Sequence, residues 1–545
     1  MSRAARPRLA VLPALLAVVA VAAAVGVAGQ QARSTATAHG WIEDGYDRLV
    51  RDAFWSRFDE TAPMALGGLA AALALLALVR RRMPGGHDLA LPLVVVLVAT
   101  AARAAAAIYD ATCPHRPNVI LVSIDTLRAD RLGTYGYARP TSPTLDARLT
   151  TGGVVFENAW SQSPKTTPSH MTMLTSLYPS AHGIGLWDGS GPAPALNPRV
   201  HTLAEILKNA GYATAAFTAG AHMHRDRGFV QGFDVYKHGS QLPRALDYLR
   251  GHRGRPFFLF FHTYEVHDPY TPPPALAAGF ATEPVPAIAA AVEAIRAGVP
   301  GWSQAHKRFW TPVDARDPRH VRYVSDLYDA GIRRMDDSTL TALLDALDAL
   351  GLADDTLLIV TSDHGEAFQE HGRFLHDDLH RETLHVPLVM RFPSRLPAGR
   401  RVPQAVGLVD LLPTILELLL LPVPAQAQGA SVAALATGAE EATAPAAQFA
   451  EYSTPGHRFE SIRRDGALLV REQEDFTLYD TAADPSEQSA LAAGAMDRGP
   501  SLVRALEAWH GENAAIAARL GPRQGDVATP SAETVDQLRA LGYVE

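Results

Sequence analysis

After residue 117, short apolar runs alternate with longer stretches in which apolar positions recur every three or four residues. The short runs are rich in β-branched and aromatic residues and predict strands at 118–125, 212–218, 256–262, 355–363 and 385–392. The longer stretches predict helices at 202–210, 322–350 and 408–421. Because these strands are apolar on both faces, we expect them to lie buried in a largely parallel sheet. The alternation therefore predicts an α/β sandwich.

The C-terminal part has a different pattern. A link rich in Gly, Ala and Glu at 426–447 precedes short polar–apolar alternations at 458–463, 467–472 and 476–479. We expect a small antiparallel sheet there, closed by a helix near 502–510. Residues 280–317, rich in Ala, Pro and Arg, predict an insertion over one face of the main sheet. The expected divisions are 1–115 for an N-terminal membrane region, 116–425 for the main domain, 448–515 for the small-sheet subdomain and 516–545 for a tail.

Three apolar runs, at 9–29, 64–79 and 89–102, occupy the N-terminal region. Basic residues flank them, namely Arg3, Arg6 and Arg8 before the first run and Arg80, Arg81 and Arg82 after the second. With these residues in the cytoplasm, we expect about three transmembrane helices, a multi-pass location in the cell membrane, and an extracytoplasmic domain after residue 110. The orientation reverses if the third run does not span the membrane. The first run is also typical of a cleavable secretory signal.

Composition narrows the classes of partner. The net charge is −8 over 545 residues, and the longest run of basic residues is the arginine triplet at 80–82, so we expect no nucleic-acid partner. The single cysteine, Cys113, excludes an intramolecular disulfide.

Two acidic residues follow buried strands that are far apart in the chain. Asp125 ends NVILVSID, and Asp363 with His364 ends TLLIVTSDH. The carboxyl ends of parallel strands meet at one edge of a sheet, where ligands bind, so a cation could draw these side chains together. Between them lies a hydroxyl-rich turn, SPKTTPSHMTMLTSLYP, in which Thr166 stands at a predicted helix start. A strand-end aspartate can also simply cap the next helix, but the combination favours a metal site that activates Thr166.

The turn at 166–176 resembles the signature of the sulfatase family, within the alkaline-phosphatase superfamily, in which Cys or Ser is followed by x-Pro-Ser-Arg. Further blocks resemble that family in its own order, namely SIDTLRADRLGTYGY, HDPYTPP, YDAGIRRMDD, TSDHGEAFQEHG, HVPLVM, LVDLLPTILELL and LYDTAADPSE. The resemblance covers about 118–487. It implies a sulfatase-like α/β/α sandwich with a small C-terminal antiparallel sheet and a catalytic domain at 116–425.

The resemblance also implies roles for individual residues. Thr166 takes the nucleophile position, and the metal ligands fall on Asp125, Asp363 and His364, whereas the second acidic position of the first block falls on Thr126. With one carboxylate lost and an imidazole present, a divalent zinc or manganese ion is favoured over calcium or magnesium. The substrate-contacting histidine falls on His267 and the group that assists the leaving group on His376, for which imidazole is well suited.

Four other side chains near these positions have roles that stay open. His170 replaces the signature arginine and, like Lys165, could stabilise charge at the nucleophile. Glu366 and His371 are candidates for orienting the metal ligands.

The sequence departs from sulfatases that depend on formylglycine. Those enzymes oxidise Cys or Ser to an aldehyde, which Thr166 cannot form, and AAFTAGAHM at 215–223 lacks the Gly-Lys-Trp-His block that holds sulfate. We therefore expect a membrane-anchored, metal-dependent hydrolase or transferase that cleaves phosphate or phosphonate esters of an envelope lipid or a glycan. One alternative is a sulfatase with a mechanism that does not use formylglycine. Another is a catalytically silent module that binds anions.

Overall fold

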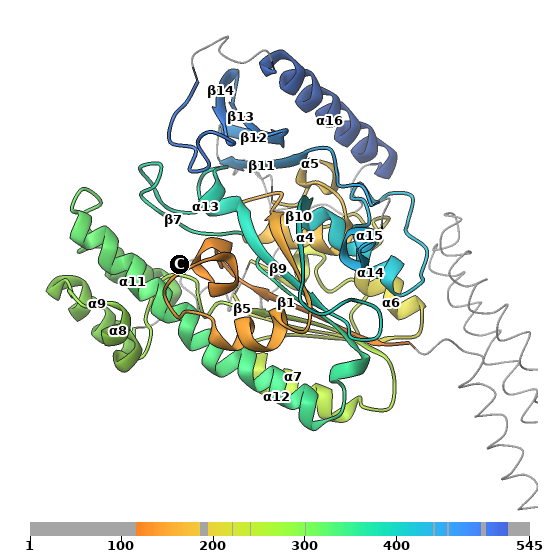
Figure 1. Cartoon of the computed structure of the whole chain (residues 1–545), viewed down its shortest axis with the longest axis horizontal. Helices are drawn as coiled ribbons and strands as arrows, with labels where there is room; N and C mark the ends of the chain where they lie inside the picture. Colours follow the sequence, from red (N-terminus) through yellow and green to blue (C-terminus); the bar gives the residue numbers. More distant parts are fainter. Residues whose placement is uncertain are drawn as a thin grey trace, which may run out of the picture. The chain divides into compact units, whose positions relative to one another are not determined.

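The computed structural model describes residues 116–521, except 186–193, 221, 240, 300, 440–441, 455–456 and 492–497. The chain divides into two compact units, 1–114 and 115–545, and the described residues all belong to the second. An eight-stranded sheet lies at the centre of this unit (Figure 1). Its strands, in spatial order, are β10 (Arg400–Gly407), β2 (Val154–Trp160), β9 (His385–Arg391), β6 (Thr356–Thr361), β1 (Asn118–Ile124), β5 (Phe257–Thr263), β3 (Ala213–Thr218) and β4 (Val235–His238).

The five strands predicted from apolar runs are β1, β3, β5, β6 and β9, and all five are present. The sheet is largely parallel, but β9 pairs antiparallel with both β2 and β6. Strands β2, β4 and β10 were not predicted. Glu157 and Asn158 interrupt the apolar run of β2, whereas β4 and β10 are edge strands with exposed polar residues, so neither forms a continuous apolar segment.

Helices cover both faces of the sheet, which confirms the predicted sandwich (Figure 1). On one face, α7 (Gln241–Gly251), α11 (Pro318–Met335) and α12 (Thr341–Ala349) pack with Ile120, Val122 and Ile124 of β1 in one apolar core. On the other face lie α4 (Thr166–Thr175), α6 (Leu203–Asn209), α14 (Leu411–Leu418) and α15 (Ala433–Thr437). Short connecting elements are α5 (Pro179–His182), β7 (Ala367–Phe368), β8 (Phe374–Leu375) and α13 (Arg381–Leu384).

Two helical predictions need adjustment. The helix expected at 322–350 begins earlier, at Pro318, where the Asp317 side chain caps it by accepting from the Arg319 N–H. A π-helical turn at Asp336–Leu340 then separates α11 from α12. The insertion expected at 280–317 consists of short helices that continue from α8 (Pro274–Phe280), namely α9 (Pro286–Arg296) and α10 (Trp302–Trp310).

The predicted small sheet is also present. Its strands β11 (Gln448–Thr454), β12 (His457–Arg464), β13 (Ala467–Glu472) and β14 (Asp475–Asp480) pair antiparallel in chain order. Helix α16 (Gly499–Leu520) closes it, because Leu502, Leu506 and Trp509 pack against Ile462 and Leu469 in a separate apolar core.

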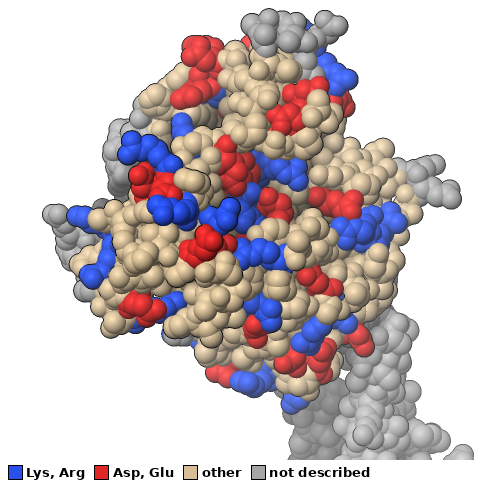
Figure 2. Space-filling model, turned by 60° about the vertical axis from the view of Figure 1, so that its left-hand side comes forward, with Lys and Arg blue, Asp and Glu red and all other residues tan. Residues whose placement is uncertain are grey.

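The expected membrane location must be corrected. No helix among the described residues is long and apolar enough to span a bilayer. The longest of them, α16, carries Arg504, Glu507, Glu512 and Arg519 along its length, which a bilayer core would not accept. The three runs predicted to span, at 9–29, 64–79 and 89–102, lie outside the described residues. Acidic and basic side chains are interspersed over the face of the molecule in Figure 2, with no extended area of one sign there.

Candidate functional site

The carboxyl ends of β1 and β6 and the start of α4 bring four predicted residues together. Asp125 follows β1, Asp363 and His364 follow β6, and Thr166 is the first residue of α4. Asp125, Asp363 and His364 are completely buried, and one ligand atom from each lies within 4.8 Å of the others. Strands β1 and β6 are adjacent and parallel. Asp125 and Asp363, which are 238 positions apart in the chain, therefore lie at the same edge of the sheet.

Asp125 has one carboxylate oxygen engaged and one unpaired. The Ala219 N–H donates to Nδ1 of His262 at 3.3 Å, so the proton of this imidazole is on Nε2. Nε2 donates it to Oδ2 of Asp125 at 3.1 Å, whereas Oδ1 of Asp125 is buried without a hydrogen-bond partner. Burial and the nearby Asp363 raise the pKa of Asp125 well above its usual value.

Asp363 likewise has one carboxylate oxygen that accepts hydrogen bonds and one that does not. Its Oδ1 accepts from the backbone N–H groups of His364 at 2.9 Å and of Thr126 at 3.2 Å. Thr126 is in the left-handed conformation, with φ of 60°, which costs free energy for a β-branched residue. Oδ2 of Asp363 is buried and has no hydrogen-bond partner in the described part of the chain.

His364 contributes a lone pair. Its Nδ1–H donates to the Gly365 carbonyl at 3.0 Å, so Nε2 is unprotonated and lies 3.4 Å from Oδ2 of Asp363. Burial and His376 lower the pKa of His364 well below its usual value, which favours the neutral ring that binds metals. Two unpaired buried carboxylate oxygens and an imidazole lone pair would be costly together without a cation. This donor set fits a divalent ion.

Thr166 lies against these groups. Its hydroxyl is 3.3 Å from Oδ2 of Asp125, to which it donates, and 3.4 Å from Nε2 of His364. Lys165 gives α4 no side-chain cap, so the first-turn N–H groups favour an anion in front of the nucleophile. The backbone position of Thr166 is therefore compatible both with a helix start and with a nucleophile.

His170 contacts the backbone of the nucleophile, and its Nδ1 also lies 3.5 Å from Oδ2 of Asp363. Its Nδ1 donates to the Thr166 carbonyl at 2.8 Å, and its Nε2 accepts from the Ser123 hydroxyl at 2.8 Å. Burial lowers the pKa of His170 to about 3, so the ring is neutral. Both nitrogens are engaged and the residue is fully buried, so His170 holds the first turn of α4 against β1.

His267 lies on the other side of Asp125, with its Nε2 4.0 Å from Oδ1 of that residue. Its Nδ1 donates to the Asp268 carbonyl at 2.8 Å. Burial opposes protonation of the ring, but Asp268 and Asp125 outweigh it and raise the pKa of His267 to about 9. In its protonated form, which this raised pKa favours, His267 can contact an anionic ester.

His376 is the second imidazole near the metal ligands, with its ring centroid 4.4 Å from that of His364. Its Nδ1 donates to Oε1 of Glu366 at 3.0 Å, which leaves Nε2 as the atom that can exchange a proton. Glu366 is fully buried and also accepts from the Tyr270 hydroxyl at 2.7 Å. Burial raises the pKa of Glu366 to about 7. Glu366, which the sequence suggested as a residue that orients the metal ligands, therefore also orients the ring of His376.

Five contacts around the site were not predicted, and they involve His262, His306, Trp310, Lys165 and Tyr452. His262 was assigned only to a strand, although a histidine at the carboxyl end of an all-apolar strand was a usable signal. The Asp268 carboxylate accepts from His306 at 2.5 Å and from Trp310 at 3.0 Å, which fixes α10 beside His267. Lys165 pairs with Asp377, next to His376. Tyr452 of the C-terminal sheet donates to the Asp377 carbonyl at 2.7 Å.

His371 lies away from the metal ligands. Its ring bonds to Glu382 and to the Glu487 carbonyl, and it stacks on His380. It joins the catalytic domain to the C-terminal part of the chain and does not orient a metal ligand.

Comparison with known proteins agrees with this geometry. The profile of the sulfatase family matches residues 117–420, and that of the C-terminal part of N-sulphoglucosamine sulphohydrolase matches 369–498. Arylsulfatase K of Canis lupus familiaris is 26% identical in an alignment of 372 positions that covers 59% of this chain and 67% of that protein. An N-acetylglucosamine-6-O-sulfatase of Bacteroides thetaiotaomicron is 22% identical in an alignment of 470 positions that covers 69% of this chain and 82% of that protein.

Among solved structures, phosphonate monoester hydrolase of Agrobacterium radiobacter aligns with a TM-score of 0.58 at 22% identity, over 74% of this chain and 96% of that one. This likeness confirms the fold. The enzyme class predicted from the sequence, an ester hydrolase, agrees with the family match.

Proposed function

Because the chain belongs to the sulfatase family, we propose that it cleaves a phosphate or phosphonate ester, with Thr166 as the nucleophile. The observation that supports this most is the Thr166 hydroxyl, which lies 3.3 Å from Asp125 and 3.4 Å from His364, beside two unpaired carboxylate oxygens. Asp125, Asp363 and His364 would hold a divalent ion. When bound, such an ion lowers the pKa of the hydroxyl and neutralises charge on the ester.

Different side chains act in successive steps of the reaction. Thr166 gives its proton to Oδ2 of Asp125, and its oxygen attacks phosphorus from the start of α4. The bond from phosphorus to the leaving oxygen breaks, and that oxygen takes a proton from Nε2 of the doubly protonated His376 ring, a form that burial and Lys165 disfavour and that Glu366 at Nδ1 stabilises. A water molecule, or an alcohol if the protein is a transferase, then attacks phosphorus, gives one proton to His376 and displaces Thr166, whose oxygen takes back the proton held by Asp125. His267 contacts a non-bridging oxygen throughout.

The identity of the nucleophile favours phosphorus over sulfur. Oxidation of a threonine hydroxyl gives a ketone, whereas the sulfatase mechanism that the family resemblance implies needs an aldehyde. A phosphothreonine needs no such conversion, because water can hydrolyse it directly at phosphorus. The solved relatives include two phosphonate monoester hydrolases, from Agrobacterium radiobacter and Silicibacter pomeroyi, which supports the same choice. The known relatives by sequence are sulfatases, so a sulfate ester is the second candidate.

The test offers the purified protein three aryl esters: a phosphodiester, a phosphonate monoester and a sulfate. We expect turnover of the first two. Thr166→Ala should lower turnover by roughly 1,000-fold or more, whereas Thr166→Ser should retain part of it. The matched control is Thr167→Ala, which removes the neighbouring buried hydroxyl that donates to the His222 carbonyl at 2.8 Å.

Intact-mass measurement of a slow variant, His376→Ala, should show a phosphoryl adduct that is absent from the double variant lacking Thr166. Strong preference for the sulfate, or full turnover by Thr166→Ala, would overturn the proposal. Absence of both metal binding and turnover would instead favour a silent module that binds anions.

A further inference from the structure

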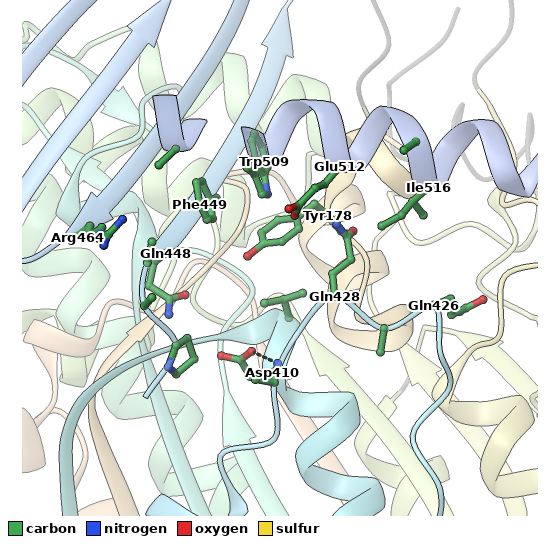
Figure 3. Close-up of a pocket in the computed structure, with 18 of the residues that line it drawn as sticks. Tyr178, Asp410, Gln426, Gln428, Gln448, Phe449, Arg464, Trp509, Glu512 and Ile516 are labelled. Atoms are coloured by element: carbon green, nitrogen blue, oxygen red, sulfur yellow. Dashed lines mark hydrogen bonds between the residues drawn. The ribbon is translucent and has the colours of Figure 1, made fainter. Parts of the chain in front are cut away.

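A seam separates the main α/β domain from the C-terminal sheet and α16, and it contains two adjoining pockets. The larger, about 610 Å³, is lined by Tyr178, Gln448, Phe449 and Trp509 among others (Figure 3). The smaller, about 420 Å³, is lined by Trp160, Arg381, Arg463 and Gln448. Both are bordered by Arg464 and by residues 445–448. None of the metal ligands or candidate catalytic residues lines either pocket. Tyr178 follows α4 at the end away from Thr166, and ten helical residues span about 15 Å.

Arg381 gives the smaller pocket an uncompensated cation. Its guanidinium is half-buried, its one hydrogen bond in the described part of the chain goes to Nδ1 of His385 at 3.3 Å, and it forms no ion pair there. The two carboxylates that act on it each have an arginine of their own. Asp130 pairs with Arg128, and Glu487 pairs with Arg463. Burial lowers the pKa of Arg381, and the positive charges of Arg463 and Arg128 add to this effect.

Arg463 stands on the same wall. Its guanidinium stacks over the Trp160 ring at 4.1 Å, and its Nε is buried without a hydrogen-bond partner. Because Arg463 is already paired with Glu487, the guanidinium of Arg381 is the group that can bind an oxyanion, and a carboxylate, sulfate or phosphate can accept two parallel N–H bonds from such a fork.

The larger pocket adds aromatic and amide groups. Tyr178, Phe449 and Trp509 form one cluster, in which the Phe449 and Trp509 rings stack at 5.0 Å and Tyr178 meets both edge-on. Gln448 lies between Arg464 and Tyr178 in the view of Figure 3. Among the residues that the structure describes, neither atom of its amide has a hydrogen-bond partner, and the same holds for Nε1 of Trp509, although both residues are only 4% exposed. Such unpaired donors and acceptors are uncommon in a folded interior and are available to a hydroxylated ligand after a small rotation of the side chain.

We propose that this seam is a second binding site, for an acidic saccharide whose anionic group pairs with Arg381 and whose ring lies in the pocket of Tyr178, Phe449 and Trp509. The anion and the ring would meet at Gln448, which lines both pockets. The binding does not depend on the chemistry proposed for Thr166, because the catalytic residues line neither pocket.

The experiment measures binding by isothermal titration calorimetry with four probes: glucuronic acid, glucose 6-sulfate, glucose and inorganic sulfate. The full chain is compared with Arg381→Gln, with Arg381→Lys and with the control Arg401→Gln. Arg401 lines neither pocket and pairs with Glu157 on an exposed part of the surface. Asp363→Ala is included to remove any anion that binds at the metal ligands. Circular dichroism checks that each variant is folded.

We expect the two acidic sugars to bind at least tenfold more tightly than glucose or inorganic sulfate. Arg381→Gln should weaken them at least tenfold, Arg381→Lys should weaken them less, and Arg401→Gln and Asp363→Ala should leave them unchanged. A preference between glucuronic acid and glucose 6-sulfate identifies the anionic group. Loss of binding in Asp363→Ala, equal binding of inorganic sulfate and the sugars, or unchanged binding in both Arg381 variants would overturn the proposal.

Discussion

Nε2 of His262 donates to Oδ2 of Asp125 at 3.1 Å, and this one hydrogen bond determines which oxygen of Asp125 is left for a cation. The two residues are 137 positions apart, on neighbouring parallel strands in which Ser123 is paired with His262. Because Oδ2 is also close to the Thr166 hydroxyl, Oδ1 remains unpaired and buried beside Oδ2 of Asp363. His262 is thus the partner that orients the carboxylate.

We predict that His262→Ala weakens divalent-metal affinity by roughly 10- to 100-fold, the range found for groups that orient a metal ligand. His262→Gln should lose less, because an amide N–H can replace Nε2. Competition with a metal-binding dye measures both affinities. Equal affinities for wild type and His262→Ala would show that the hydrogen bond does not matter for the metal.

Metal removal should abolish activity, and Asp363→Ala should lower metal affinity roughly 10-fold or more, because three protein ligands leave none to spare. Zinc or manganese should restore activity better than calcium, since an imidazole is part of the donor set. Adding metal should raise the melting temperature of the wild type but not of Asp363→Ala. Asp345→Ala, at an exposed aspartate that pairs with Arg148, is the control. Full activity after chelation would contradict this prediction.

His376→Ala should impair poor leaving groups more than good ones, because a general acid matters only when the departing oxygen needs a proton. We expect a loss of roughly 100-fold or more with phenyl esters and under about 10-fold with 4-nitrophenyl esters. Glu366→Gln should show the same dependence more weakly, since it disturbs the ring through Nδ1. His457→Ala, at an exposed residue of β12, serves as the control. An equal loss with both esters would assign His376 to substrate binding instead.

Because of Glu487, the free energy of unfolding should fall as the pH becomes acidic. Burial opposes its ionisation, but Arg463 and the His380 hydrogen bond outweigh it and hold the pKa of Glu487 well below its usual range. A depressed pKa means that the stabilisation is complete above about pH 4.3, the usual value for glutamate, and is lost as the pH falls below it. Glu487→Gln should cost on the order of 3 kcal/mol at pH 7, because it leaves Arg463 uncompensated.

Denaturant unfolding between pH 3 and pH 7 measures how the free energy of unfolding changes with pH. The curve for Glu487→Gln should be flatter below about pH 4.3 than that of the wild type. Glu474→Gln, at a side chain that is 93% exposed, should leave the curve unchanged. Parallel curves for wild type and Glu487→Gln would contradict the prediction.

The sequence by itself determined the main strands, because each is a continuous apolar run whose burial on both faces needs no knowledge of its neighbours. It also located Asp125, Asp363 and His364 at strand ends, and the rule that parallel strands end on one edge was enough to bring them together. Strands β4 and β10 could not be predicted in this way, because an edge strand is stabilised by pairing on one side and carries no apolar signature of its own.

Only the tertiary structure decided what surrounds those ligands. The role of His262 depends on the register of β1 with β5, and that of His170 on the direction in which α4 leaves the sheet. The approach of Tyr452 to Asp377 depends on how the C-terminal sheet packs against the main domain. Local sequence patterns indicate whether a residue is buried and how often apolar residues recur. The contacts named above, except that of His170 with Thr166, join residues 75 or more positions apart. Such pairs form only when the whole sheet and its covering helices are in place.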